Sequence, residues 1–189
     1  MLPSSSLYAL AQHTGVAFSW VHDTISELQA RGWVAENAPM RVIDAGAIFN
    51  WWNQNRRPPT LTSLQVQDAH LTAHQLGDAG KIPNAVTTYY AENWYQKHLF
   101  PRRLDTYVPA DRVIEAKRWL VEHGALIGGV NFRLWSADAA LVEDAIPGPR
   151  GPMQLHYAPI PQVIVDLMWE GGSAKEAAEM MIQGCFRAA

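Results

Sequence analysis

The chain of 189 residues has few cysteines, few charges and no long apolar run. Its one cysteine, Cys185, excludes a disulfide framework within the chain, so nothing points to an oxidising compartment. No stretch approaches the roughly 20 apolar residues that a transmembrane helix needs. The N-terminus lacks the charged region and the apolar run of a signal peptide. We therefore expect a cytoplasmic protein that spans no membrane.

Charged residues make up 17% of the chain, and the net charge of −3 argues against broad binding of polyanions. Internal repeats and low-complexity tracts are also absent from the sequence. Hydrophobic residues reach 48%, which is enough to bury the core of one or two domains. Helix-like and strand-like segments follow one another without strict alternation, so the expected fold class is α+β.

Residues 4–43 are the most informative segment, because they have the pattern of a helix-turn-helix followed by a short wing. The serines at 4–6 can cap a first helix, and Gly15 breaks that helix. A second helix is expected over 17–31, where apolar residues recur three and four apart on one face: Val21, Ile25, Leu28. β-prone runs around Asn37-Ala38-Pro39 predict the two strands of a wing.

A helix-turn-helix places its second helix in the major groove of DNA, so this pattern indicates which side chains would face the bases. The candidate DNA-binding residues are Ser19, Trp20, His22, Asp23, Ser26, Arg31, Arg41. DNA affinity comes mostly from cations that meet phosphates. The outward face of the second helix holds the acids Asp23 and Glu27 and no Lys or Arg. DNA binding, a winged helix used for protein contact or dimerisation, and a mistaken motif all remain open.

A domain boundary is expected close to residue 57. Asp44 can cap a helix over 44–54, and the run Asn55-Arg56-Arg57-Pro58-Pro59 that follows is polar and ends in two prolines, which cannot continue a helix. We therefore expect a winged helix-turn-helix with its linker helix over 1–57. A mixed α/β domain is expected over 60–189.

The second domain has helix and strand patterns in mixed order. The expected helices cover 67–77, 89–98, 110–123, 161–169 and 173–183. The expected strands cover 85–88, 104–108, 130–135 and 153–157. Ser173 and Glu176 have the spacing of a capping box at the start of the last helix.

Five segments, taken in order, carry a resemblance to a known family. They are ALAQHTGVAFSWVHDTISELQARGWV, VIDAGAIFNWW, LDTYVP, VNFRLW and PIPQVIVDLMWEGGSAKEAAEMM. Together they resemble the AbiEi-type antitoxins of type IV, abortive-infection toxin–antitoxin systems, over about Leu7 to Met181. The ending, from Val165 to Glu179, is the most specific part of this resemblance.

The resemblance implies a DNA-binding transcriptional regulator that is also an antitoxin. In that family a winged helix represses its own promoter, and a C-terminal domain counters a nucleotidyltransferase-like toxin. The implied partners are therefore the double-stranded DNA of its own promoter and such a toxin. A homodimer would match a palindromic operator. The alternative function is a protein-interaction module that keeps the winged-helix fold and no longer binds DNA.

Metal and catalytic chemistry has weaker support. His70 and His74 fall on one face of a helix, with Asp78 a turn further on, and two histidines with a carboxylate can bind zinc. Leu71, however, follows the first histidine where a metalloprotease has glutamate. A solvated helix face is the simpler interpretation. The sequence has no phosphate-cradling or nucleotidyltransferase motif, so we expect no enzymatic activity, no cofactor and no metal.

A basic cluster lies in the second domain, where cations alternate with aromatic residues over 95–103. Such a combination can engage single-stranded or looped nucleic acid, or an acidic protein. The arginines of the linker could extend it. The candidate basic patch therefore comprises Arg56, Arg57, Lys97, Arg102, Arg103. An ordinary surface turn is the alternative interpretation.

Overall fold

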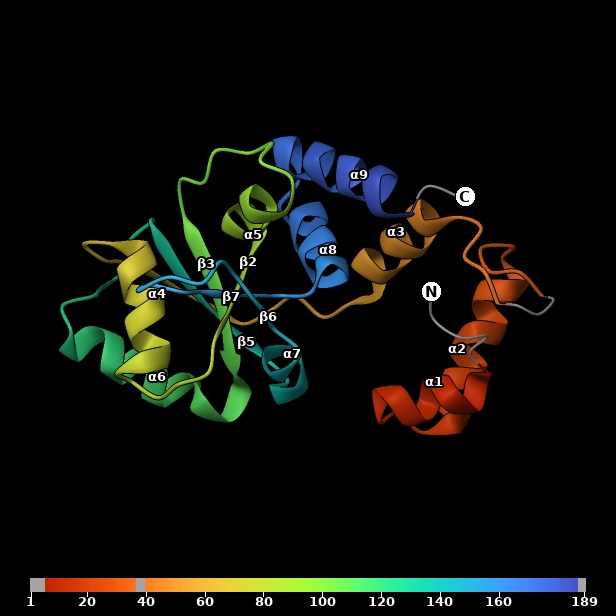
Figure 1. Ribbon diagram of the computed structural model, residues 1–189, viewed down its shortest axis with the longest axis horizontal. Helices are drawn as coiled ribbons and strands as arrows, with labels where there is room; N and C mark the ends of the chain where they lie inside the picture. Colours follow the sequence, from red (N-terminus) through yellow and green to blue (C-terminus); the bar gives the residue numbers. More distant parts are fainter. Residues whose placement is uncertain (1–5, 37–39, 187–189) are drawn as a thin grey trace. The chain divides into compact units, whose positions relative to one another are not determined.

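A computed structural model describes residues 6–36 and 40–186 (Figure 1). The chain divides into two compact units. The N-terminal unit runs to Gln54 and also takes in the residues from Ile182 onward, and the sheet unit comprises Asn55–Met181. The residues from Ile182 onward thus belong with the N-terminal unit, whereas the sequence pattern assigned them to the second domain.

The N-terminal unit holds α1, α2 and all but the last residue of α3. These helices are α1 (Leu7–Thr14), α2 (Phe18–Ala30) and α3 (Ala45–Asn55). An antiparallel β-bridge joins Val34 to Val42 between α2 and α3. The turn expected there, Asn37-Ala38-Pro39, lies outside the described residues.

Local chemistry explains where these helices begin and end. The hydroxyl of Ser6 accepts a hydrogen bond from the amide of Ala9 at 3.2 Å, which satisfies a free donor at the start of α1. Ser4 and Ser5, the other two expected caps, lie outside the described residues. Gly15 follows α1 with φ of 67°, a left-handed conformation that glycine adopts without a steric penalty. The Oδ1 atom of Asp44 accepts from the Ala47 amide at 2.8 Å and starts α3 as expected.

The N-terminal unit has a small apolar core. Its buried side chains are Ala11, Val21, Leu28, Val34, Ala45, Phe49. Phe186, at the end of α9, meets Phe49 edge to face, with ring centroids 5.5 Å apart. One face of α2 is therefore buried, and the opposite face remains exposed.

The sheet unit contains a seven-stranded mixed sheet among its described residues, with strand order β4-β1-β5-β3-β2-β7-β6. The strands are β1 (Leu61–Gln65), β2 (Ala85–Thr87), β3 (Leu104–Pro109), β4 (Leu126–Ile127), β5 (Phe132–Ala137), β6 (Ile146–Pro147) and β7 (His156–Tyr157). β3 and β5 run parallel at the centre, while β1 and β2 are antiparallel to their central neighbours. With helices on this sheet, the α+β prediction is confirmed.

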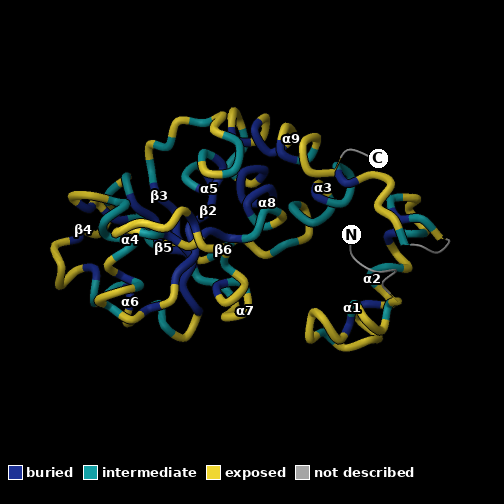
Figure 2. The backbone as a smooth tube through the Cα atoms, viewed as in Figure 1, coloured by how far each residue is buried: buried dark blue, intermediate teal, exposed yellow. Residues whose placement is uncertain are grey.

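Helices cover both faces of the sheet. They are α4 (Ala69–Asp78), α5 (Thr88–Tyr95), η1 (Ala110–Arg112), α6 (Val113–Glu122), α7 (Ala139–Glu143), α8 (Ile160–Glu170) and α9 (Gly172–Phe186). On β3, Thr106 bonds to Asn84, which bonds in turn to the Ala73 carbonyl of α4. Asp105 and Tyr107 point to the opposite face, where Tyr107 donates to Asp166 of α8 and Arg103 links Asp105 to Glu170 of α8. Every residue of β3 is buried, as the dark central strands of Figure 2 show.

Several elements differ from the sequence pattern. β1, β4, β6 and α7 were not predicted, and the strand expected over 153–157 is reduced to β7. The last helix begins at Gly172, so Ser173 lies in its first turn and not at the capping position. None of the described helices has the length and apolar character needed to cross a membrane.

Candidate functional site

The exposed face of α2 carries most of the residues predicted to contact DNA. Ser19, Trp20, His22, Asp23 and Ser26 are all exposed. Trp20 has 62% of its surface exposed, and Phe18 at the start of the helix has 48% exposed. The Phe18 ring lies 6.2 Å from the His22 ring, and His22 Nδ1 lies 3.2 Å from a carboxylate oxygen of Asp23. This face therefore presents aromatic and hydrogen-bonding groups together.

The two arginines predicted to contact DNA have different surroundings. Arg31 donates to Glu27 at 2.8 Å, and its guanidinium lies 5.0 Å from the centre of the Trp33 ring. The side chain of Arg41 is exposed and forms no ion pair with any residue that the structure describes. Arg41 is thus the better placed of the two to meet a phosphate.

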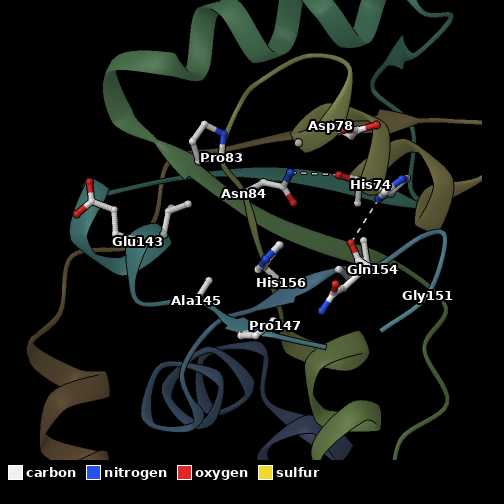
Figure 3. A pocket seen from close by; sticks show the side chains of 14 residues that line it. His74, Asp78, Pro83, Asn84, Glu143, Ala145, Pro147, Gly151, Gln154 and His156 are labelled. Atoms are coloured by element: carbon white, nitrogen blue, oxygen red, sulfur yellow. Dashed lines mark hydrogen bonds between the residues drawn. The ribbon is translucent and has the colours of Figure 1, made fainter. Parts of the chain in front are cut away.

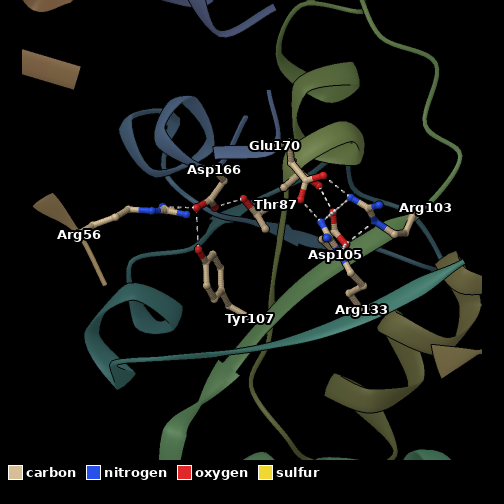
Figure 4. A network of polar contacts seen from close by, with 9 residues as sticks. Arg56, Thr87, Arg103, Asp105, Tyr107, Arg133, Asp166 and Glu170 are labelled. Carbon is tan, nitrogen blue, oxygen red and sulfur yellow. Dashed lines mark hydrogen bonds and ion pairs between the residues drawn. The ribbon is translucent and has the colours of Figure 1, made fainter. Parts of the chain in front are cut away.

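The candidate basic patch separates into buried and exposed members. Arg57, Lys97 and Arg102 are exposed. The side chains of Arg56 and Arg103 are only 10% and 23% exposed, because each is paired with carboxylates inside the sheet unit. These two arginines belong to a buried polar network between α8 and the sheet (Figure 4).

Asp166 is the centre of one half of this network. It lies on α8, is fully buried, and accepts hydrogen bonds from Arg56 Nη1 at 2.6 Å, from the Tyr107 hydroxyl at 2.8 Å, and from Gln162 and Thr87. Burial raises the pKa of Asp166, and the Arg56 charge opposes that shift. Burial and the nearby Asp166 carboxylate both raise the pKa of Tyr107, so this phenol stays protonated and donates.

Asp105 is the centre of the other half. It lies on β3 and accepts from Arg133 Nε at 2.6 Å and from Arg103 Nε at 2.9 Å, and it also accepts from the Thr88 hydroxyl. Both guanidinium groups also donate hydrogen bonds to the carboxylate of Glu170 at the end of α8, and the bond from Arg103 measures 2.8 Å. Two cations therefore meet two carboxylates, and the charges of this cluster balance.

Strand register and helix spacing build the network. β3 and β5 are parallel with Asp105 opposite Arg133 and Tyr107 opposite Trp135, so these four side chains share one face of the sheet. On α8, the polar residues recur every four positions, at Gln162, Asp166, Glu170. Residues spaced by four lie on one side of a helix, so this stripe faces the polar strand residues. The stripe within the otherwise apolar run IPQVIVDLMWE was the sequence signal that could have revealed the network.

The network has the chemistry of an internal brace. All the carboxylate oxygens of Asp105 and Asp166 accept hydrogen bonds from protein donors, so both carboxylates are engaged within the protein. Two nitrogens of Arg56 and the indole nitrogen of Trp135 are buried donors that find no acceptor among the residues that the structure describes. We conclude that these charges hold α8 on the sheet.

A cavity of about 680 Å³ lies elsewhere in the sheet unit, between α4, α7 and the strands β6 and β7 (Figure 3). Its polar lining consists of His74, Asp78, Asn84, Glu143, Gln154, His156. His74 Nδ1 lies 3.3 Å from the Gln154 carbonyl oxygen. His70, the second histidine that the sequence places on the same helix face as His74, is not part of this lining. Among the residues that the structure describes, no three His, Cys, Asp or Glu side chains are grouped so that they could hold a metal ion.

No family model matches the chain, and no curated protein matches it. The functional proposal therefore depends on the geometry of the two units and on the residues that they expose.

Proposed function

We propose that the chain is a DNA-binding transcriptional regulator whose N-terminal unit is a winged helix-turn-helix. The observation that carries this proposal is the exposed face of α2, with Ser19, Trp20 and His22 on a helix that follows α1 after a tight turn. A recognition helix needs such a face, because it must reach base edges while its other side is packed.

The neighbouring elements support the same proposal. α1 and α2 are in contact, Ala11 of α1 and Val21 and Leu28 of α2 are buried, and Gly15 makes the turn between the two helices. The bridge between Val34 and Val42 follows α2 directly, at the position where a winged helix has its wing. Arg41 lies beside that bridge and is exposed, as a residue that contacts the DNA backbone must be.

Recognition would depend more on base contacts than on charge. Ser19 and His22 can form hydrogen bonds with base edges, and the indole of Trp20 can contact a thymine methyl group. Because the exposed face of α2 has acids and no Lys or Arg, sequence-independent attraction to phosphates is weak. Shape and direct contacts would then supply the specificity.

The resemblance to AbiEi-type antitoxins supports a second role for the sheet unit. In this proposal the regulator acts in the cytoplasm, binds its own promoter as a homodimer, and counters a nucleotidyltransferase-like toxin through the sheet unit. Co-purification of the chain with the product of an adjacent nucleotidyltransferase-like gene would support this role. The absence of any complex, with both proteins folded, would contradict it.

The decisive experiment measures binding of the purified protein to its own upstream DNA at low and moderate salt. The test variant replaces Ser19, Trp20 and His22 with alanine. The matched control replaces three exposed residues on α6 in the sheet unit with alanine: Ile114, Arg118 and Glu122. We expect the control to bind like wild type and the α2 variant to lose specific binding by more than about tenfold, since each good base contact contributes roughly 1–3 kcal/mol. Equal binding by both variants would contradict the proposal.

A protein-interaction module is the second candidate. It is favoured by the exposed aromatic side chains of α2, Phe18 and Trp20, on a face that lacks basic residues. Sedimentation of wild type and a Trp20→Ala variant tests it. Self-association that the variant abolishes, together with no DNA binding, would favour this candidate over the regulator.

A further inference from the structure

A groove of about 510 Å³ in the sheet unit is bordered by aromatic and basic side chains. It lies between α5, the loop after it, and the start of α9, and is lined by Tyr89, Leu99, Phe100, Arg102, Arg103, Ser173. Two aromatic rings, two guanidinium groups and a serine hydroxyl thus border one space. Pockets of several hundred Å³ are of the size that holds a small organic ligand.

Phe100 is exposed in a loop that is held firmly in place. With 84% of its surface exposed, it is the most exposed of the large hydrophobic side chains that the structure describes. The fully buried carboxylate of Glu92 accepts from the amides of His98 and Leu99 at 3.1 and 2.7 Å, and Asn93 donates to the Leu99 carbonyl at 2.8 Å. The anchored loop therefore holds the Phe100 ring in contact with water. Exposing this apolar surface is unfavourable, and a ligand stacked on the ring would offset that cost.

Tyr89, another residue of this lining, is held in place by its surroundings. The Arg103 guanidinium lies 5.3 Å from the centre of its ring, and that guanidinium is itself fixed by Asp105 and Glu170. Burial, with the nearby Glu170 charge, raises the pKa of Tyr89, so the phenol keeps its proton and can donate. The guanidinium of Arg103 is thus already paired with carboxylates of the protein.

Arg102, in contrast to Arg103, keeps its guanidinium exposed to solvent. Its side chain is exposed, and it forms no ion pair or hydrogen bond with any residue in the described part of the chain. It borders the same groove as Ser173, whose hydroxyl can donate to an anion. A guanidinium with free donors suits a phosphate group.

We propose that this groove binds a nucleotide, with the base against the Phe100 ring and the phosphate at Arg102 and Ser173. An aromatic platform beside an unpaired guanidinium is the combination that recognises a base and its phosphate together. The ligand is a free mononucleotide or an unpaired nucleotide of a single strand, since both offer the same base and phosphate. The site lies in the sheet unit and does not depend on DNA recognition by α2.

The test is direct titration of the full-length protein. AMP, inorganic phosphate and a short fluorescein-labelled oligo(dA) are titrated by calorimetry or fluorescence anisotropy into wild type, Phe100→Ala and Arg102→Ala. The matched controls are Val130→Ala and Arg150→Ala, which change an exposed apolar residue and an exposed arginine outside the groove. Circular dichroism checks that each variant is folded.

We expect nucleotide binding that each groove variant weakens about tenfold or more and that the controls leave unchanged. Binding of AMP would identify a free nucleotide as the ligand, and binding of the oligonucleotide alone would identify a single strand. The variant with alanine at Ser19, Trp20 and His22 must retain this binding. The proposal fails if wild type binds neither ligand, if either groove variant binds like wild type, or if phosphate alone binds as well as AMP.

Discussion

At the scale of single residues, the burial and pairing of the two aspartates of the network make the chain sensitive to their substitution. Asp166 and Asp105 have no exposed surface, yet each meets a guanidinium and further donors. Removing one member of a buried pair leaves the other charge without compensation, which costs more than the pair itself contributes. The network therefore makes particular substitutions severe even where they remove few atoms.

Asp166→Ala tests this sensitivity. The change leaves the Arg56 guanidinium buried without its partner, so we expect the free energy of unfolding to fall by about 3–5 kcal/mol. Chemical denaturation followed by fluorescence measures it. Asp144→Ala is the matched control, because Asp144 is exposed, and it should stay within about 0.5 kcal/mol of wild type. A small effect at Asp166 would mean that the network is not a brace.

Tyr95 gives the expected dependence on alkaline pH. Burial, together with the nearby Tyr157, raises the pKa of Tyr95 to about 12, and its hydroxyl donates to the Ala158 carbonyl at 2.9 Å. In the unfolded chain a tyrosine has a pKa of about 10. The raised value means that the contribution of Tyr95 to stability is complete below pH 10 and is lost as the pH rises toward 12.

Tyr95→Phe has no ionisable hydroxyl at this position. Its free energy of unfolding should be lower than that of wild type at neutral pH, because the hydrogen bond is lost. The difference between the two proteins should then shrink between pH 10 and 12. Denaturant unfolding at each pH measures this difference, and a constant difference would show that the Tyr95 proton is not linked to folding.

Arg56 and Arg103 show which part of a site the sequence could not predict. Both occur in polar turns beside other cations, and such arginines are mostly exposed. Their burial depends on Asp166, Asp105 and Glu170, which are distant in the sequence and come together only through the register of β3 and β5 and the packing of α8. No local pattern around either arginine contains that information.

At the scale of elements, the turn between α1 and α2 depends on one glycine. Gly15 has a φ of 67°, and a side chain in this conformation is strained even though no atom lies within 4 Å of an added Cβ. Gly15→Ala should destabilise the two helices by about 1 kcal/mol. Hydrogen exchange of the α1 and α2 amides measures this local effect.

Gly151→Ala is the control for that prediction. Gly151 also has open space around an added Cβ, but its backbone is not left-handed. The substitution should leave stability unchanged or slightly increased, because alanine restricts the unfolded chain. Equal exchange rates in the two variants would show that the left-handed turn contributes nothing to the helices.

Long elements with clear periodicity were predictable, and short ones were not. Residues 17–31 predicted α2 with its ends within about a residue, because apolar spacing and Gly32 define it. β1, with the sequence Leu61-Thr62-Ser63-Leu64-Gln65, has no strong alternation and becomes a strand by pairing with β5. α7 and β4 are too short to carry a period at all.

At the scale of the whole molecule, the balance of charge limits how DNA can be bound. The net charge is −3, and the described part of the N-terminal unit contains only the arginines Arg31 and Arg41 as permanent cations. The logarithm of the binding constant falls with the logarithm of salt concentration by about 0.9 for each phosphate contact. We therefore expect a shallow slope, about −2 for one copy and about −4 for two.

Binding titrations at several salt concentrations measure that slope. Arg41→Ala should make it less steep by about 1 while leaving sequence preference unchanged, as expected for a phosphate contact. Arg150→Ala, a change of another exposed arginine that lies in the sheet unit, serves as the control. A slope near −8 in wild type would require cations from outside the N-terminal unit.

The pairing of Phe49 with Phe186 has a consequence for synthesis. A growing chain emerges from the ribosome N-terminus first, so α1, α2 and α3 are available long before the ring that packs on Phe49. The sheet unit lies wholly between these two phenylalanines in the sequence. It can therefore fold while the earlier helices still lack the contact with Phe186. The first part of the chain to be made is thus the last to be completed.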